Sequence, residues 1–220
     1  MPALRAPTAI LFDLDGTLVD TVAARIDAWS AVFEEFGIPL TRTQLEPMIG
    51  MDGRQLAREV ALAAGLRLGD EEAEAIDRRS GSVFDERNRD PKPLPGAWEL
   101  LRSLDDHGLA WAIATSSRRE QVTASIAALG LGRAPRIVDG SQVERAKPAP
   151  DLLLLGAREL GVAPDGCWYV GDSTWDMRAA TAAGMVAIGV LAGAAVDDGA
   201  LRDAGATIVV PSLRDVDVSG

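Results

Sequence analysis

Residues 8–17, TAILFDLDGT, combine a short apolar run with two aspartates and a glycine. The apolar part is typical of a β-strand, and Gly16 suits a turn that ends it. Successive side chains of an extended chain point to opposite faces, so Asp13 and Asp15 lie on one side and Leu14 on the other. The sequence therefore predicts a pair of carboxylates at the carboxyl end of a buried strand.

From Gly96 onward, strand-like and helix-like segments alternate along the chain. The strand-like runs are 109–117, 136–140, 166–173, 185–190 and 206–210. The helix-like runs are 96–108, 118–130, 151–161, 174–184 and about 198–204. This alternation predicts an α/β fold, a Rossmann-like doubly wound parallel sheet with helices on both faces. Ligands of such sheets bind beyond the carboxyl ends of the strands, where the polar residues of this chain gather.

The stretch between the first strand and this alternating part has a different pattern. Residues 22–37, 55–65 and 70–86 carry apolar side chains at helical spacing, and no convincing strand is present. The proline-rich segment RDPKPLPG, 89–96, marks the return to the sheet. We therefore expect a core domain made of 1–17 and 92–220, with an inserted α-helical cap domain at 18–91.

Composition narrows the class of protein. Of 220 residues, 47% are apolar, but no run approaches the ~18 residues of a membrane span. The net charge of −11 argues against a nucleic-acid backbone as partner. A single cysteine, Cys167, cannot form an internal disulfide, and the first residues do not resemble a signal peptide. We expect a cytoplasmic monomer or weak homodimer that acts on a small molecule.

Two further aspartates extend the carboxylate group. Asp172 ends a predicted strand and Asp176 follows one helical turn later. Converging carboxylates repel one another unless a cation joins them, and oxygen ligands without His or Cys suit Mg²⁺. Each segment by itself has an ordinary alternative: the first two acids could be solvated in a turn, and Ser173 or Thr174 could simply cap a helix.

Hydroxyl and lysine side chains complete the candidate site. Thr115 and Ser116 follow a strand and precede a helix, where hydroxyls and free backbone N–H groups can bind an anion or cap the helix. Lys147 is one of two lysines beside twenty arginines. It is either a solvated surface group or a compact charge that Arg cannot replace.

The four segments together resemble the motifs of the haloacid dehalogenase superfamily of phosphohydrolases. They are DLDGT at 13–17, Thr115 with Ser116, Lys147 in KPAPD, and GDSTWD at 171–176. The helical insert directly after DGTLVDT is similar to the subfamily of phosphoglycolate phosphatase and β-phosphoglucomutase. The resemblance covers residues 8 to about 210.

This resemblance implies a phosphatase that acts on a small phosphorylated metabolite. Asp13 would attack phosphorus and form an aspartyl phosphate, and Asp15 would act as general acid and then base. Thr115 and the amide of Ser116 would hold phosphate oxygens, while Lys147 would neutralise charge on the nucleophile and the phosphoryl group.

The resemblance also implies Mg²⁺ as cofactor. The side chains of Asp13 and Asp172 and the backbone carbonyl of Asp15 would bind the ion. Asp176 would bind it through water or orient Lys147.

Other members of the superfamily are alternatives, and the runner-up is a sugar-phosphate mutase of the β-phosphoglucomutase type. Dehalogenases lack the second aspartate, which is present here as Asp15, and phosphonate-cleaving relatives use a lysine of the insert, which residues 18–90 lack. β-Phosphoglucomutase-like mutases use a histidine shortly after the DT of the first motif, and an ungapped alignment places Arg25 there. A non-catalytic binding module on the same fold is the alternative outside enzymes, although no motif acid is missing.

The insert is expected to close over the cleft as a lid and to set the specificity. Its candidate substrate contacts are Arg25, Met51, Asp52 and Arg54.

Overall fold

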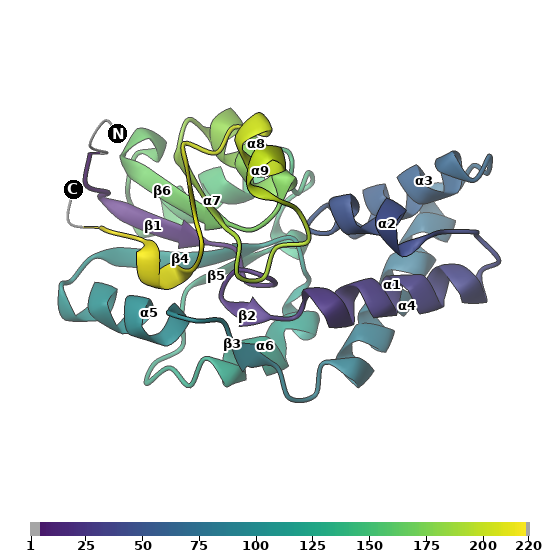
Figure 1. Cartoon of the computed structure of the whole chain (residues 1–220), viewed down its shortest axis with the longest axis horizontal. Helices are drawn as coiled ribbons and strands as arrows, with labels where there is room; N and C mark the ends of the chain where they lie inside the picture. Colours follow the sequence, from purple (N-terminus) through teal and green to yellow (C-terminus); the bar gives the residue numbers. More distant parts are fainter. Residues whose placement is uncertain (1–4, 219–220) are drawn as a thin grey trace.

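The computed structural model describes residues 5–218 and contains a six-stranded, fully parallel sheet (Figure 1). Its strands are β1 (Ala9–Phe12), β4 (Ala110–Thr115), β5 (Ile137–Asp139), β6 (Cys167–Gly171), β7 (Val186–Val190) and β8 (Ile208–Val210). They lie in the order β5-β4-β1-β6-β7-β8, with β1 paired to β4 and β6. The predicted α/β fold with a parallel sheet is confirmed.

Helices cover both faces of the sheet, as its largely apolar strands require. They are α5 (Ala97–Asp106), α6 (Thr123–Ala128), α7 (Asp151–Leu160), α8 (Thr174–Ala183) and α9 (Asp198–Asp203). On one face, Ile10 and Phe12 of β1 pack in a cluster with Leu101 of α5. On the other, Leu11 packs in a cluster with Leu153 of α7. Alternate residues of β1 thus belong to two separate cores.

One predicted helix, 118–130, is divided in the structure. A 3₁₀ turn, Arg119–Val122, precedes the short α6. The side-chain Oε1 of Gln121 accepts a hydrogen bond from the backbone N–H of Arg118, which closes this tighter turn before the α-helix begins.

The insert forms a helical body of its own beside the sheet (Figure 1). Its helices are α1 (Val22–Glu35), α2 (Arg42–Leu45), α3 (Gly53–Ala63) and α4 (Asp70–Arg87). They bury a separate apolar cluster that includes Trp29, Phe33, Leu56 and Phe84. The insert therefore has the packing expected of a cap.

The two chain crossings between sheet and insert form a short ribbon that the sequence did not indicate. β2 (Val19–Asp20) pairs antiparallel with β3 (Lys92–Pro93). A strand of two residues is too short to show an alternation of apolar and polar side chains, so this pair of strands could not be predicted from the sequence. Leu18 and Val19 pack in the cluster on the sheet. We keep 18–91 as the proposed cap and 1–17 with 92–220 as the proposed core.

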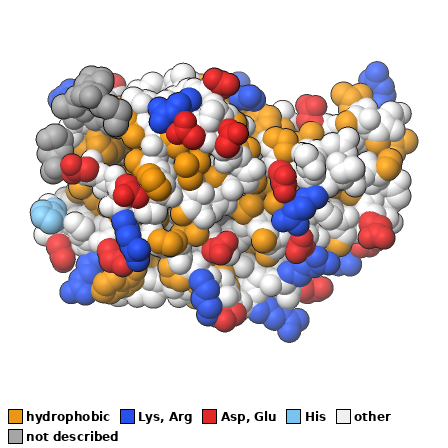
Figure 2. All heavy atoms as spheres, viewed as in Figure 1, with side chains coloured by type: hydrophobic (Ala, Val, Ile, Leu, Met, Phe, Trp, Pro, Cys, Tyr) orange, Lys and Arg blue, Asp and Glu red, His pale blue; other side chains and the backbone are white. Residues whose placement is uncertain are grey.

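The surface in Figure 2 carries acidic and basic side chains interspersed with hydrophobic ones. Neither sign of charge dominates this face, although the whole chain carries a net charge of −11. No helix among the described residues is long and apolar enough to cross a membrane.

Candidate active site

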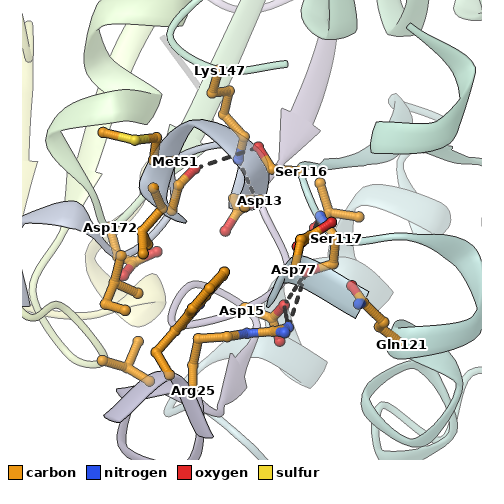
Figure 3. Close-up of a pocket in the computed structure, with 17 residues that line it drawn as sticks. Asp13, Asp15, Arg25, Met51, Asp77, Ser116, Ser117, Gln121, Lys147 and Asp172 are labelled. Atoms are coloured by element: carbon orange, nitrogen blue, oxygen red, sulfur yellow. Dashed lines mark hydrogen bonds and ion pairs between the residues drawn. The ribbon is translucent and has the colours of Figure 1, made fainter. Parts of the chain in front are cut away.

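The carboxyl ends of three neighbouring strands meet at one cavity under the cap (Figure 3). Asp13 follows β1, Thr115 ends β4 and Ser116 follows it, and Asp172 follows β6. Lys147 reaches the same cavity from the loop before α7. The topology therefore brings together residues that are up to 159 positions apart in the sequence.

The turn after β1 is fixed by contacts with the loop after β6. Gly16 has φ +85°, and a Cβ at this position would lie 2.3 Å from Oδ2 of Asp172. Thr17 Oγ1 donates a hydrogen bond of 2.8 Å to Oδ1 of Asp172. The backbone N–H of Asp13 donates to Val170 O at 2.9 Å. A glycine and a small hydroxyl residue at these positions therefore set the spacing between Asp13 and Asp172.

Lys147 lies at the centre of the carboxylate group. Its Nζ donates to Asp13 Oδ1 at 2.6 Å, to Asp176 Oδ1 at 2.7 Å and to the hydroxyl of Tyr169 at 3.0 Å. The side chain is only 1% exposed. Burial alone lowers the pKa of Lys147, but the charges of Asp13 and Asp176 outweigh it and raise the pKa, so the ammonium persists. The structure contradicts the surface-lysine interpretation.

Asp176 is held from both sides by hydrogen bonds. Its Oδ2 accepts from the backbone N–H and the hydroxyl of Ser173, at 3.0 and 2.6 Å. Its Oδ1 accepts from Lys147 and lies 3.1 Å from the hydroxyl of Tyr169. The side chain is fully buried and does not line the cavity. Asp176 is thereby placed to orient Lys147 from behind.

The negative charges of Asp13 and Asp172 are only partly balanced by the nearby ammonium. Burial raises the pKa of Asp13 to about 7, even though Lys147 lowers it. Burial and the charges of Asp176 and Asp13 raise the pKa of Asp172 well above its usual range. One oxygen each of Asp13, Asp172 and Asp176 lie within 4.8 Å of one another. Three buried carboxylates share one ammonium, and this all-oxygen donor set fits a hard divalent cation such as Mg²⁺.

Asp15 has a different environment, made largely by the cap. Arg25 of α1 donates to its Oδ2 at 2.7 Å, Ser117 donates to the same oxygen at 2.8 Å, and Thr21 donates to Oδ1 at 2.8 Å. Burial alone raises the pKa of Asp15, but the charge of Arg25 and these hydrogen bonds reverse the effect and lower it. Asp15 is therefore held as a carboxylate.

The structure places most of the expected site residues together. The cavity is lined by Asp13, Asp15, Thr115, Ser116, Lys147 and Asp172, together with the cap residues Arg25 and Met51. Asp52 and Arg54 do not line it. The carboxylate of Asp52 caps the start of α3 by accepting from the N–H groups of Arg54 and Gln55, so the expectation that Asp52 and Arg54 contact substrate is not supported.

Three residues at the site were not found from the sequence. In the sequence, Tyr169 has the pattern of a buried strand residue. The position of its hydroxyl becomes known only from the fold. Asp77 and Gln121 line the cavity from α4 and from the 3₁₀ turn after β4. Asp77 sits among many charged residues of a polar helix, and no motif distinguishes it.

Comparison with known proteins gives a consistent family. The family model of haloacid dehalogenase-like hydrolases matches residues 10–190. Phosphoglycolate phosphatase of Xanthomonas campestris is 31% identical over 89% of this chain and 88% of its own length. Hexitol phosphatase A of Escherichia coli is 35% identical over 82% of this chain and 81% of its own. The structure of a hydrolase from Pseudomonas syringae superposes with a TM-score of 0.90 at 34% identity, covering 96% of this chain and 95% of the other.

Proposed function

This chain belongs to the haloacid dehalogenase-like hydrolases, and on that premise we propose that it hydrolyses a small phosphomonoester through a phosphorylated Asp13. It is a phosphatase of this family. The observation that carries the finer proposal is the position of Lys147, whose Nζ bridges Asp13 and Asp176 while Asp13 faces the cavity. A buried ammonium beside one carboxylate is suited to neutralise charge on an incoming phosphoryl group.

Asp13 is the proposed nucleophile. One carboxylate oxygen forms a bond to phosphorus while the ester bond to the leaving oxygen breaks. Thr115 and the backbone N–H of Ser116, at the end of β4, are proposed to hold the remaining phosphate oxygens. Lys147 stays protonated throughout, because its two carboxylate partners favour the charged form.

Asp15 is the proposed acid and base. A protonated Asp15 gives its proton to the leaving oxygen in the first step and becomes a carboxylate. In the second step this carboxylate takes a proton from the attacking water, whose oxygen bonds to phosphorus while the bond between Asp13 and phosphorus breaks, and Asp15 is protonated again. The contacts with Arg25, Thr21 and Ser117 hold the carboxylate form, which is the form that the second step requires. The resulting products are the free alcohol and inorganic phosphate.

The proposed cofactor is Mg²⁺, held by Asp13 and Asp172 and by the backbone carbonyl of Asp15, with Asp176 in contact only through water or through Lys147. When bound, the ion would neutralise negative charge shared by the carboxylates and the phosphoryl group. The crowding of buried carboxylates at this point, with a raised pKa for Asp172, is the structural support for this assignment.

The test is release of p-nitrophenol from p-nitrophenyl phosphate. Activity should need Mg²⁺, disappear with chelator, and be inhibited by Ca²⁺, whose looser coordination misplaces the nucleophile.

Asp13→Asn should lower kcat by at least about 10³-fold, because an amide is a poor nucleophile. Asp139→Asn is the matched control, since Asp139 is a buried aspartate at the end of β5 that does not line the cavity. Full activity without metal, or a tenth of the activity in Asp13→Asn, would contradict the mechanism.

A further inference from the structure

The positive charges at the cavity are already engaged by carboxylates. Among the described residues that line it, only Arg25 and Lys147 carry a positive charge. Arg25 lies 2.7 Å from Asp15, and Lys147 lies 2.6 Å from Asp13. Next to the cavity, Arg118 binds Glu74 and Asp77. Each of these cations is therefore already paired with a carboxylate, and an anionic group on the leaving part of a substrate would have to compete with that carboxylate.

Asp77 of α4 presents an acceptor to the cavity. Burial raises the pKa of Asp77 above its usual range, although Arg118 lowers it. Its Oδ2 accepts a hydrogen bond of 3.0 Å from Arg118, and its Oδ1 has no hydrogen-bond donor within residues 5–218. Gly53 at the start of α3 packs directly on this carboxylate, because a Cβ there would lie 1.9 Å from Oδ1. A side chain at position 53 would displace the carboxylate, so glycine is required for its placement.

Gln121 presents a donor beside it. Its Oε1 accepts from the N–H of Arg118, which fixes the amide so that Nε2 faces away from that turn. The side chain is only 8% exposed, yet Nε2 donates to no residue of the described chain. It packs on Gly81, one helical turn after Asp77 on α4, since a Cβ at Gly81 would lie 2.0 Å from Nε2. Figure 3 shows the amide end of Gln121 pointing toward the cavity, from the same side as Asp77.

We infer that Asp77 and Gln121 bind hydroxyl groups of an uncharged, polyhydroxylated leaving group, so that the substrate is a polyol phosphate rather than a phosphate ester bearing a carboxylate. This inference rests on the proposed phosphatase function and concerns the same cavity. A hydroxyl both donates and accepts, and it satisfies a carboxylate oxygen and an amide N–H that line the same cavity. A carboxylate in the same place would lie against Asp77, and like charges at that distance repel. The neighbouring Arg118 already pairs with Asp77 and Glu74. Hydrolysis adds one water to the ester and yields the free polyol and inorganic phosphate.

Three small substrates that differ in the charge of the leaving group test the inference. They are glycerol 1-phosphate, 2-phosphoglycolate and O-phosphoethanolamine, compared by kcat/KM from phosphate release with Mg²⁺ present. Glycerol 1-phosphate should exceed 2-phosphoglycolate by about thirtyfold or more, because buried polar groups left unpaired by the wrong ligand penalise it strongly. Preference for 2-phosphoglycolate or O-phosphoethanolamine would overturn the inference.

Variants of Asp77 and Glu74, the two partners of Arg118, distinguish direct recognition of the substrate by Asp77 from a purely structural role of the Arg118 ion pairs. Asp77→Asn keeps the shape of the side chain and should reduce the ratio of the two kcat/KM values by about tenfold, because repulsion of the carboxylate is lost. Glu74→Gln weakens the same Arg118 bridge without lining the cavity, and it should leave the ratio within about threefold of the wild type. An equal effect of both variants, or none in Asp77→Asn, would contradict a direct role of Asp77.

Failure of the inference and failure of the proposed function give different results. If the chain does not turn over p-nitrophenyl phosphate in an Asp13-dependent manner, the phosphatase mechanism itself is wrong. If it does so but prefers the anionic substrate, only the assignment of Asp77 and Gln121 is wrong.

Discussion

At the scale of single residues, the ammonium of Lys147 is the most constrained group of the site. Its three acceptors, Asp13, Asp176 and Tyr169, lie at 2.6, 2.7 and 3.0 Å, and the side chain is 1% exposed. A guanidinium is planar and larger, and it cannot direct donors to three acceptors around one point. Removing one partner of a buried charge cluster leaves the others uncompensated.

We therefore expect Lys147→Arg to be nearly as damaging as Lys147→Ala, with kcat lowered by about 10²-fold or more in both. Lys92→Arg is the matched control, because Lys92 is exposed and its ion pair is with the exposed Asp90. Steady-state hydrolysis of p-nitrophenyl phosphate measures the effect, and circular dichroism verifies folding. High activity of Lys147→Arg would mean that the compact ammonium is not needed.

The motif residues could be predicted from the sequence because their spacing is local and their chemistry is rare. Asp13 and Asp172 directly follow strands that can be recognised from the sequence, Asp15 lies in the turn after Asp13, and the fold then brings them together. Tyr169 and Gln121 could not be found in this way. Their roles depend on which side of the sheet a strand residue faces and on the conformation of one 3₁₀ turn, and both are properties of the tertiary structure.

At the scale of secondary-structure elements, α4 contains a glycine in its interior. Gly81 costs helical stability, by about 1 kcal/mol relative to Ala, but it gives the Gln121 amide room to lie against the helix. The same helix carries Asp77 one turn earlier. The low helix propensity of Gly81 thus accompanies a close contact between α4 and the core domain.

The contact between Gly81 and Gln121 predicts that the effect of Gly81→Ala on stability depends on Gln121. In a Gln121→Ala background, where the amide is gone, Gly81→Ala should raise the free energy of unfolding by about 0.5–1 kcal/mol. In the wild-type background the gain should be smaller by at least about 0.5 kcal/mol, because Nε2 must move. Urea denaturation of the four proteins measures this coupling. Equal gains in both backgrounds would show that Gly81 and Gln121 do not interact.

The strands of the sheet were predictable because each is a buried apolar run flanked by Gly or polar residues. Two elements were not. The β2–β3 ribbon is two residues on each side and has no periodicity to detect. Segment 118–130 has the composition of a continuous helix, but the hydrogen bond between Arg118 and the side chain of Gln121 imposes a tighter turn at its start.

At the scale of the whole molecule, the cap rests on the core through several polar contacts. The indole N–H of Trp175, at the start of α8, donates to Pro47 O of the cap at 2.9 Å. Ser116 donates to Gly50 O at 3.4 Å, and Arg118 pairs with Glu74 at 2.8 Å. These contacts hold the cap against the carboxyl ends of the strands.

Loss of one such contact should weaken closure without touching the reacting groups. We expect Trp175→Phe, which keeps an aromatic ring but removes the donor, to raise KM by about threefold with little change in kcat. Trp98→Phe is the control, because Trp98 is an exposed tryptophan of α5 and does not line the cavity. Steady-state kinetics with a phosphate ester separates the two parameters. A change in kcat alone would place Trp175 in the chemical step instead.

A hydrolase and a mutase differ in the group that accepts the phosphoryl group from the aspartyl phosphate. In a hydrolase it is water, and in a mutase it is a second sugar hydroxyl. A mutase must suppress hydrolysis of the aspartyl phosphate until the sugar is bound. Here the group beside Asp15 is Arg25, at 2.7 Å, and the only histidine of the chain, His107, lies outside the cap. Arg stays protonated and cannot relay a proton near neutral pH. We therefore expect steady phosphate release from simple phosphomonoesters without a bisphosphate activator. Stoichiometric conversion of β-glucose 1-phosphate to glucose 6-phosphate, with little free phosphate, would instead identify a mutase.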